Sequence, residues 1–90
     1  MDKYKPMSVQ IIENNLDIVK TISDIFKNKG VSDDDLMSIG CIGLIKAANE
    51  IEKKKFTKET IYTYIVSKIE YELLRFFEVK ENLLWKNGIQ

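Results

Sequence analysis

The 90-residue sequence contains no histidine, one cysteine (Cys41) and one proline (Pro6). Without histidine the chain lacks the commonest general base and the commonest metal ligand, and a single cysteine cannot form an internal disulfide. The sequence also contains no Gly-rich phosphate loop and no paired-cysteine motif. We therefore predict a protein that is not an enzyme and that uses no metal and no cofactor, and we interpret Cys41 as a small packing residue.

Neither sign of charge dominates, because 14 Lys and Arg residues balance 14 Asp and Glu residues. A basic field over the whole molecule is therefore absent, and any binding of nucleic acid must come from a local patch. The N-terminal residues 1–6 lack the apolar segment of a signal peptide, and no run approaches the length of a membrane span. We expect a cytoplasmic protein that makes no contact with a membrane.

The length and composition, with 44% hydrophobic and 31% charged residues, indicate one small globular domain over residues 1–90. Three apolar segments with helical spacing and short connections predict an all-α bundle of three to four helices. Residues 1–6 form a polar lead-in. Residues 80–90 form a tail, in which Leu83, Leu84 and Trp85 are predicted to add a short helical turn that covers one end of the bundle.

Two of the predicted helices are amphipathic. The first runs from about Met7 to Phe26 and ends before Gly30, which suits the left-handed position after a helix. The last runs from about Lys58 to Val79, with Thr57 as a weak cap. Its predicted core stripe consists of Tyr62, Val66 or Ile65, Ile69, Leu73, and Phe76 or Phe77.

The central helix, from about Asp33 to Glu52, is unusual because apolar residues surround it almost completely. Its start is marked by Ser32, which can accept hydrogen bonds from the first turn, and by three successive aspartates at the positive end of the helix. Gly40 and Gly43 lie in its interior, where each glycine costs about 1 kcal/mol relative to alanine. A helix that is apolar all round is buried on every side or binds a partner on one side. We expect the side of the two glycines and Ala47 to permit close approach of another helix.

The central segment also resembles a known motif. Asp35-Leu36, Gly40, Ile42-Gly43-Leu44 and Lys46-Ala47 are similar to the Asp-Leu-x-x-x-Gly-x-x-Gly-Leu-x-x-Ala pattern in region 2 of bacterial RNA polymerase sigma factors. The resemblance extends over about residues 10–77. It implies a sigma region 2-like bundle whose central helix lies against the clamp coiled coil of the largest subunit of core RNA polymerase. The positions that it assigns to this contact are Asp34, Asp35, Ser38, Ile39, Cys41 and Ile45. The alternative interpretation is that these residues only form the core.

The resemblance also implies that the last helix binds the single-stranded −10 region of promoter DNA. Tyr64, Lys68, Tyr71 and Arg75 follow one another at three- and four-residue steps and therefore share one helix face. Aromatic rings for base stacking beside cations for phosphates are what single-strand binding needs. Lys53, Lys54 and Lys55 could add contacts to the DNA backbone. The alternative is a solvated helix face.

The sequence departs from the sigma pattern in two respects. Ser67 and Lys68 stand where sigma factors have a tryptophan pair that wedges into the duplex fork, and within these 90 residues we expect no second domain that reads the −35 element. We therefore expect a transcription initiation factor that works with a separate partner that reads the −35 element. The alternative is an interaction module that binds RNA polymerase or a sigma partner and regulates transcription without contacting DNA.

Overall fold

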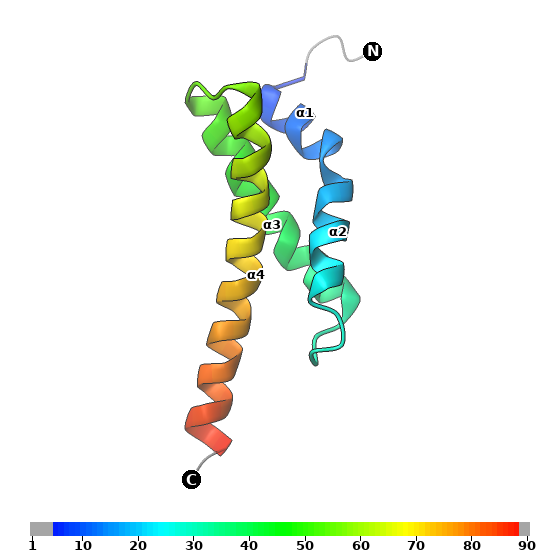
Figure 1. Cartoon of the computed structure of the whole chain (residues 1–90), viewed down its shortest axis with the longest axis vertical. Helices are drawn as coiled ribbons and strands as arrows, with labels where there is room; N and C mark the ends of the chain where they lie inside the picture. Colours follow the sequence, from blue (N-terminus) through cyan, green and yellow to red (C-terminus); the bar gives the residue numbers. More distant parts are fainter. Residues whose placement is uncertain (1–4, 89–90) are drawn as a thin grey trace.

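The structure, a computed structural model, describes the backbone of residues 5–88 and the side chains of residues 5–81. It consists of four helices, α1 (Met7–Asn14), α2 (Leu16–Ile25), α3 (Asp33–Lys53) and α4 (Lys58–Gly88), as Figure 1 shows. No strand is present among these described residues. The predicted all-α bundle of three to four helices is confirmed. None of the described helices is both long and apolar enough to cross a membrane.

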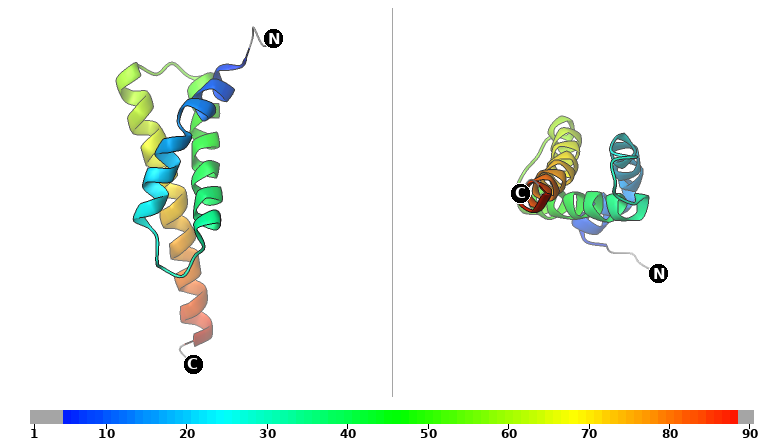
Figure 2. Two further views of the ribbon diagram at one scale, coloured as in Figure 1. Left: turned by 90° about the vertical axis from the view of Figure 1, so that its right-hand side faces the viewer. Right: turned by 90° about the horizontal axis from the view of Figure 1, so that it is seen from below.

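Helix α3 is the centre of the bundle, because it contacts each of the other three helices. Seen from below in Figure 2, α2 and α4 lie against α3 as two separate arms. At 1.5 Å per residue α4 is about 46 Å long, and its C-terminal end extends past the other helices (Figure 1). The molecule is therefore elongated, with extents of 57 × 25 × 19 Å.

The core lies where these arms meet α3. The buried apolar side chains that form it are Val19, Ile22, Leu36, Leu44, Ala47, Ile51, Ile65, Ile69 and Leu73. On α4 the structure selects Ile65 over Val66 for the core. Phe77 packs against this core and stacks on Phe26, with ring centroids 5.6 Å apart.

Tyr62, which we predicted to lie in the core stripe of α4, is 60% exposed, so that prediction is wrong. It lines a groove between the α1–α2 bend and the first turns of α4. Tyr62 lies two turns before Ile69 on the same side of α4, but its ring is left exposed beside the α1–α2 bend.

The predicted first helix is also wrong in one respect, because Asn15 divides it into α1 and α2. Asn15 has φ −127° and ψ 17°, and its side-chain amide donates to the Ile11 carbonyl oxygen at 2.7 Å. A short polar side chain that forms a hydrogen bond to the backbone competes with the backbone hydrogen bonds of the helix. The bend lets α1 turn toward the end of α3, where the Ser8 N–H donates to the Glu52 carboxylate at 3.2 Å.

The last helix is longer than predicted, since α4 continues without a break from Lys58 to Gly88. The sequence explains this, because no proline or glycine occurs between residues 58 and 87. The predicted end at Val79 is therefore wrong. The predicted covering of the bundle by Leu83, Leu84 and Trp85 concerns side chains outside the described residues.

The turn between α2 and α3 behaves as predicted. Gly30 has a φ of 86°, a backbone conformation that glycine adopts without a steric cost. The Ser32 hydroxyl oxygen then accepts from the Asp35 N–H at 3.1 Å and caps α3.

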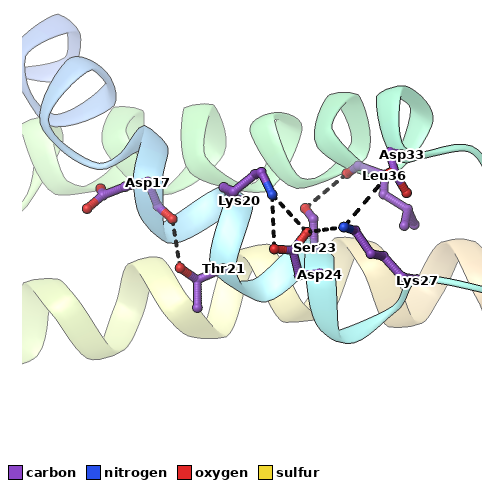
Figure 3. A network of polar contacts seen from close by, with 8 residues as sticks. All are labelled: Asp17, Lys20, Thr21, Ser23, Asp24, Lys27, Asp33 and Leu36. Atoms are coloured by element: carbon purple, nitrogen blue, oxygen red, sulfur yellow. Dashed lines mark hydrogen bonds and ion pairs between the residues drawn. The ribbon is translucent and has the colours of Figure 1, made fainter.

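A network of polar contacts ties α2 to the start of α3 (Figure 3). Lys20 and Lys27 both lie beside the Asp24 carboxylate, at 3.0 and 3.4 Å, and Lys27 also approaches Asp33 at 3.9 Å. Below them the buried Ser23 hydroxyl donates to the Leu36 carbonyl oxygen at 3.4 Å. The hydrogen bond from Lys20 is the main cause that lowers the pKa of Asp24 below its ordinary value.

The two central glycines of α3 allow the other helices to approach its backbone. A Cβ atom at Gly43 would lie 2.6 Å from the Lys68 carbonyl oxygen and 2.7 Å from the Ile69 Cα atom of α4. At Gly40 it would lie 2.8 Å from Val19 Cγ1 and 3.1 Å from the Ser23 Oγ atom of α2. The predicted close approach on the glycine side of α3 is therefore present. The contact with α4 is the tighter one, because there the backbone of α4 and not a side chain lies against Gly43.

We expect Gly43→Ala to destabilise the domain. Overpacking costs about 1–3 kcal/mol or more when neighbours cannot move aside, whereas the gain in helix propensity returns only about 1 kcal/mol. Thermal unfolding followed by circular dichroism should show a lower Tm, by about 4–8 °C for each kcal/mol lost. Asn49→Ala, on the exposed side of α3, is the control and should not lower Tm. An unchanged Tm for Gly43→Ala would contradict the backbone contact.

We expect Asp24→Asn to lower Tm at neutral pH and to have no effect at about pH 2. Because the pKa of Asp24 is lowered in the folded state, its contribution to stability is present above the unfolded-state pKa and disappears as pH falls through the folded-state value. The effect should be small and should shrink in high salt, since the group is exposed. Glu70→Gln is the control, because Glu70 has no ion-pair partner among residues 5–81. Equal Tm losses at both pH values would refute the assignment.

Candidate interface on α3 and α4

The side of α3 that faces away from the core exposes both charged and apolar residues. Of the six positions predicted to contact a partner, four are exposed: Asp34, Asp35, Ser38 and Ile45. Ile39 and Cys41 are half-buried and pack against the core. The interpretation of the whole set as core residues therefore fails for the four exposed positions.

Ile42, which we did not predict to contact a partner, belongs to the same exposed side. It is 45% exposed, and Ile45 is 44% exposed. The signal was present in the sequence, because Ile42 follows Ser38 at a four-residue step. We define the α3 face as the exposed residues Asp34, Asp35, Ser38, Ile42 and Ile45. It is acidic at the start of the helix and carries two exposed isoleucines in the middle.

Beyond this face, an ion pair connects α3 with α4. The Lys46 ammonium lies 2.8 Å from the Glu72 carboxylate, whose side chain is only 12% exposed. Ion pairs of this partly buried kind hold two helices in one register, although their net contribution to stability is modest. The pair also neutralises Glu72, which lines a groove together with Ile42 of the α3 face.

Three of the four predicted DNA-contact residues of α4 lie together. The Lys68 ammonium is 5.8 Å from the centroid of the Tyr64 ring and 5.9 Å from that of the Tyr71 ring. Both distances are within the range of cation–π attraction. Tyr64 is half-buried and Tyr71 is exposed, and the two tyrosines are about 10 Å apart along the helix axis. We define these three residues as the tyrosine face.

The lysine segment lies at the Tyr64 end of the tyrosine face. Phe56, which follows Lys55, packs on the Tyr64 ring with a centroid distance of 5.0 Å. Reciprocal hydrogen bonds between Thr57 and Thr60 hold the start of α4, with each backbone N–H donating to the other residue's hydroxyl at 3.0 and 3.2 Å. The side chains of Lys53, Lys54 and Lys55 are exposed, and Lys54 is paired with Glu50 at 3.3 Å.

Arg75, the fourth predicted DNA-contact residue, lies one turn beyond Tyr71 on the same side of α4. It lines a groove of about 250 Å³ between α3 and α4, together with Ile39, Ile42, Glu72, Phe76 and Val79. The structure therefore brings Tyr64, Lys68 and Tyr71 together and associates Arg75 with residues of α3.

These features define a class of protein. It is a small all-α bundle organised around a capped helix with two interior glycines. That helix has an acidic and apolar face, and the next helix carries aromatic and basic residues. Comparison with known proteins identifies relatives of this class. The chain is 44% identical over 66 residues to the RNA polymerase sigma-E factor of Clostridium acetobutylicum, which covers 73% of this chain and 27% of that protein. It is 44% identical over 69 residues to the RNA polymerase sigma-28 factor of Bacillus thuringiensis subsp. kurstaki, covering 77% of this chain and 28% of the relative.

A third relative is the RNA polymerase sigma-K factor of Bacillus subtilis, which is 42% identical over 64 residues, or 71% of this chain and 21% of the relative. No protein-family model matches the chain. The chain is therefore homologous to bacterial RNA polymerase sigma factors over about three-quarters of its length, and the predicted resemblance is confirmed. It spans only about a quarter of the length of these relatives.

Proposed function

We propose that the protein is a sigma region 2-like transcription initiation factor that docks on core RNA polymerase and contacts the −10 strand of promoter DNA. The observation that carries this proposal is the similarity to sigma factors over about three-quarters of the chain. The protein would act in the cytoplasm, where it meets the polymerase and its promoters, and it would be a binding protein without catalytic activity of its own.

Docking would use the α3 face. Exposed Ile42 and Ile45 offer apolar area to a partner helix, and Asp34 and Asp35 offer carboxylates at one end. Burial of apolar area at the centre of an interface, with charges at its rim, is typical of protein–protein contacts. The proposed partner is the clamp coiled coil of the largest polymerase subunit. Ile39 and Cys41 would support this face from below.

Contact with the −10 strand would use the tyrosine face. Exposed Tyr71 and half-buried Tyr64 can stack on bases, and the ammonium of Lys68 between their rings can meet a phosphate. Lys53, Lys54 and Lys55 would continue the cationic path along the DNA backbone. We also propose that a separate partner protein reads the −35 element.

A second candidate function is regulation of transcription through protein contacts alone. Two observations favour it: the net charge is zero, and Ser67 and Lys68 occupy the positions of the sigma tryptophan pair. In that case the α3 face would bind polymerase or a sigma factor, and the tyrosine face would have no DNA partner.

We expect Ile45→Glu to weaken binding to purified core RNA polymerase by at least about tenfold, because a carboxylate would be buried without a partner in the apolar centre of the interface. Biolayer interferometry with immobilised core enzyme measures the effect. Leu74→Glu is the matched control, since Leu74 is an exposed apolar residue of α4 outside the α3 face. If the wild-type protein does not bind the core enzyme, or if Ile45→Glu binds as tightly as Leu74→Glu, docking through α3 is refuted.

We expect Tyr71→Ala to weaken binding to a single-stranded −10 oligonucleotide by about 5- to 150-fold, the loss expected for one stacked base. Fluorescence anisotropy in the presence of core polymerase is the measurement. Tyr62→Ala is the control, because Tyr62 is an equally exposed tyrosine that lies outside the tyrosine face.

The affinity should also fall steeply with salt, and Lys68→Gln should reduce that salt dependence by about one phosphate contact. Equal effects of Tyr71→Ala and Tyr62→Ala, or no DNA binding at all with polymerase present, would favour the second candidate function.

A further inference from the structure

The groove between α3 and α4 combines apolar walls with one cation. Ile39 and Ile42 of α3 and Phe76 and Val79 of α4 supply the walls, and Arg75 and Glu72 supply the charged groups. Ile42 and Val79 are the most accessible of the apolar residues, at 45% and 50% exposure. Ile42 is also part of the α3 face, so the groove and the proposed docking surface are continuous.

The charges at this groove are unequal. Glu72 is already paired with Lys46 at 2.8 Å, whereas Arg75 forms no ion pair with any of residues 5–81. Arg75 is therefore the lining charge that has no ion-pair partner among residues 5–81. The complementary ligand therefore carries an apolar group and a negative charge close together.

The size of the groove restricts the ligand further. Its volume of about 250 Å³ is below the range of about 300–1,000 Å³ that holds a drug-sized molecule or cofactor. It has room for one or two amino-acid side chains. In a helix, residues three or four apart lie on the same side, so a partner helix can present an aliphatic side chain and a carboxylate together.

We infer that this groove is the anchor pocket of the docking surface, and that Arg75 binds a carboxylate of a protein partner and not a phosphate of DNA. The inference rests on the proposed docking to core RNA polymerase. The occupant is an amphipathic helix of the polymerase that inserts an aliphatic side chain between Ile42 and Val79 and places an Asp or Glu against the guanidinium. A DNA strand would bring phosphate and sugar to these walls and would leave the apolar surface in contact with water.

Two successive stretches of α4 then have separate tasks. The tyrosine face, within residues 64–71, is available to a nucleic acid, while the next two turns, residues 72–79 beside Ile39 and Ile42, extend the protein interface of α3. Arginine is suited to this role because its planar guanidinium binds carboxylates through two parallel hydrogen bonds. A few residues that become buried at the centre of an interface, arginines prominent among them, carry most of the affinity of protein–protein complexes.

Two substitutions test the pocket, Arg75→Glu and Val79→Lys. Each should weaken binding to purified core RNA polymerase by at least about tenfold, because the first repels the partner carboxylate and the second fills the apolar pocket with a cation. Lys58→Glu is the charge-reversal control, at the other end of α4, and Leu74→Lys is the control for an exposed apolar residue. Both controls should bind within about twofold of the wild type. Circular dichroism of all four variants confirms that each is folded.

Binding to the single-stranded −10 oligonucleotide without polymerase distinguishes the two roles of Arg75. If Arg75→Glu loses DNA binding but retains polymerase binding, Arg75 contacts DNA and the inference is overturned. If Ile45→Glu abolishes polymerase binding while Arg75→Glu and Val79→Lys do not, the docking proposal stands and the pocket fails alone. If the wild-type protein does not bind polymerase, both fail together.

Discussion

The contact between the backbone of α3 at Gly43 and the backbone of α4 at Lys68 and Ile69 is the constraint on which the rest of the structure depends. No side chain separates the two helices there, because a Cβ atom at residue 43 would lie 2.6 Å from a carbonyl oxygen. The close approach helps to bury Leu44, Ile65 and Ile69, whose side chains are almost completely inaccessible. It also sets which sides of α3 and α4 remain accessible.

The accessible surface then divides by helix and by chemistry. The α3 face is acidic at its start and apolar in the middle, and the groove beside it adds the guanidinium of Arg75. The tyrosine face of α4 holds an ammonium between two aromatic rings. Under the proposed function the first surface would bind a protein and the second a single strand of DNA. The ion pair between Lys46 and Glu72 keeps the two surfaces in a fixed relation.

Much of the fold was predictable because local signals and apolar periodicity agree. The cap at Ser32, the glycine at the end of the α2–α3 turn and the glycine side of α3 are all consequences of short-range chemistry, and the structure contains them. The division at Asn15 was missed because the apolar stripe continues across it, while the amide bonds back to the Ile11 carbonyl. The extension of α4 to Gly88 was missed because residues 80–90 were assigned to a separate tail, although no proline or glycine occurs between residues 58 and 87. The tyrosine face was predictable from spacing alone. The exposure of Ile42 was missed because this residue lies between the two glycines, on a segment that we expected to pack against another helix.

The sequence by itself determined the helical class, the position of the central helix and the family resemblance, because these depend on residue types at fixed spacings along one chain. Only the tertiary structure decided which apolar residues are core and which are surface, since Tyr62, Ile42 and Arg75 owe their surroundings to the angle between helices. Helical spacing states which residues share a side of one helix, but it does not state how far the neighbouring helix extends over that side. For this reason Tyr62 lies outside the core, and Arg75, on the same helix as the tyrosine face, lines a groove with residues of α3.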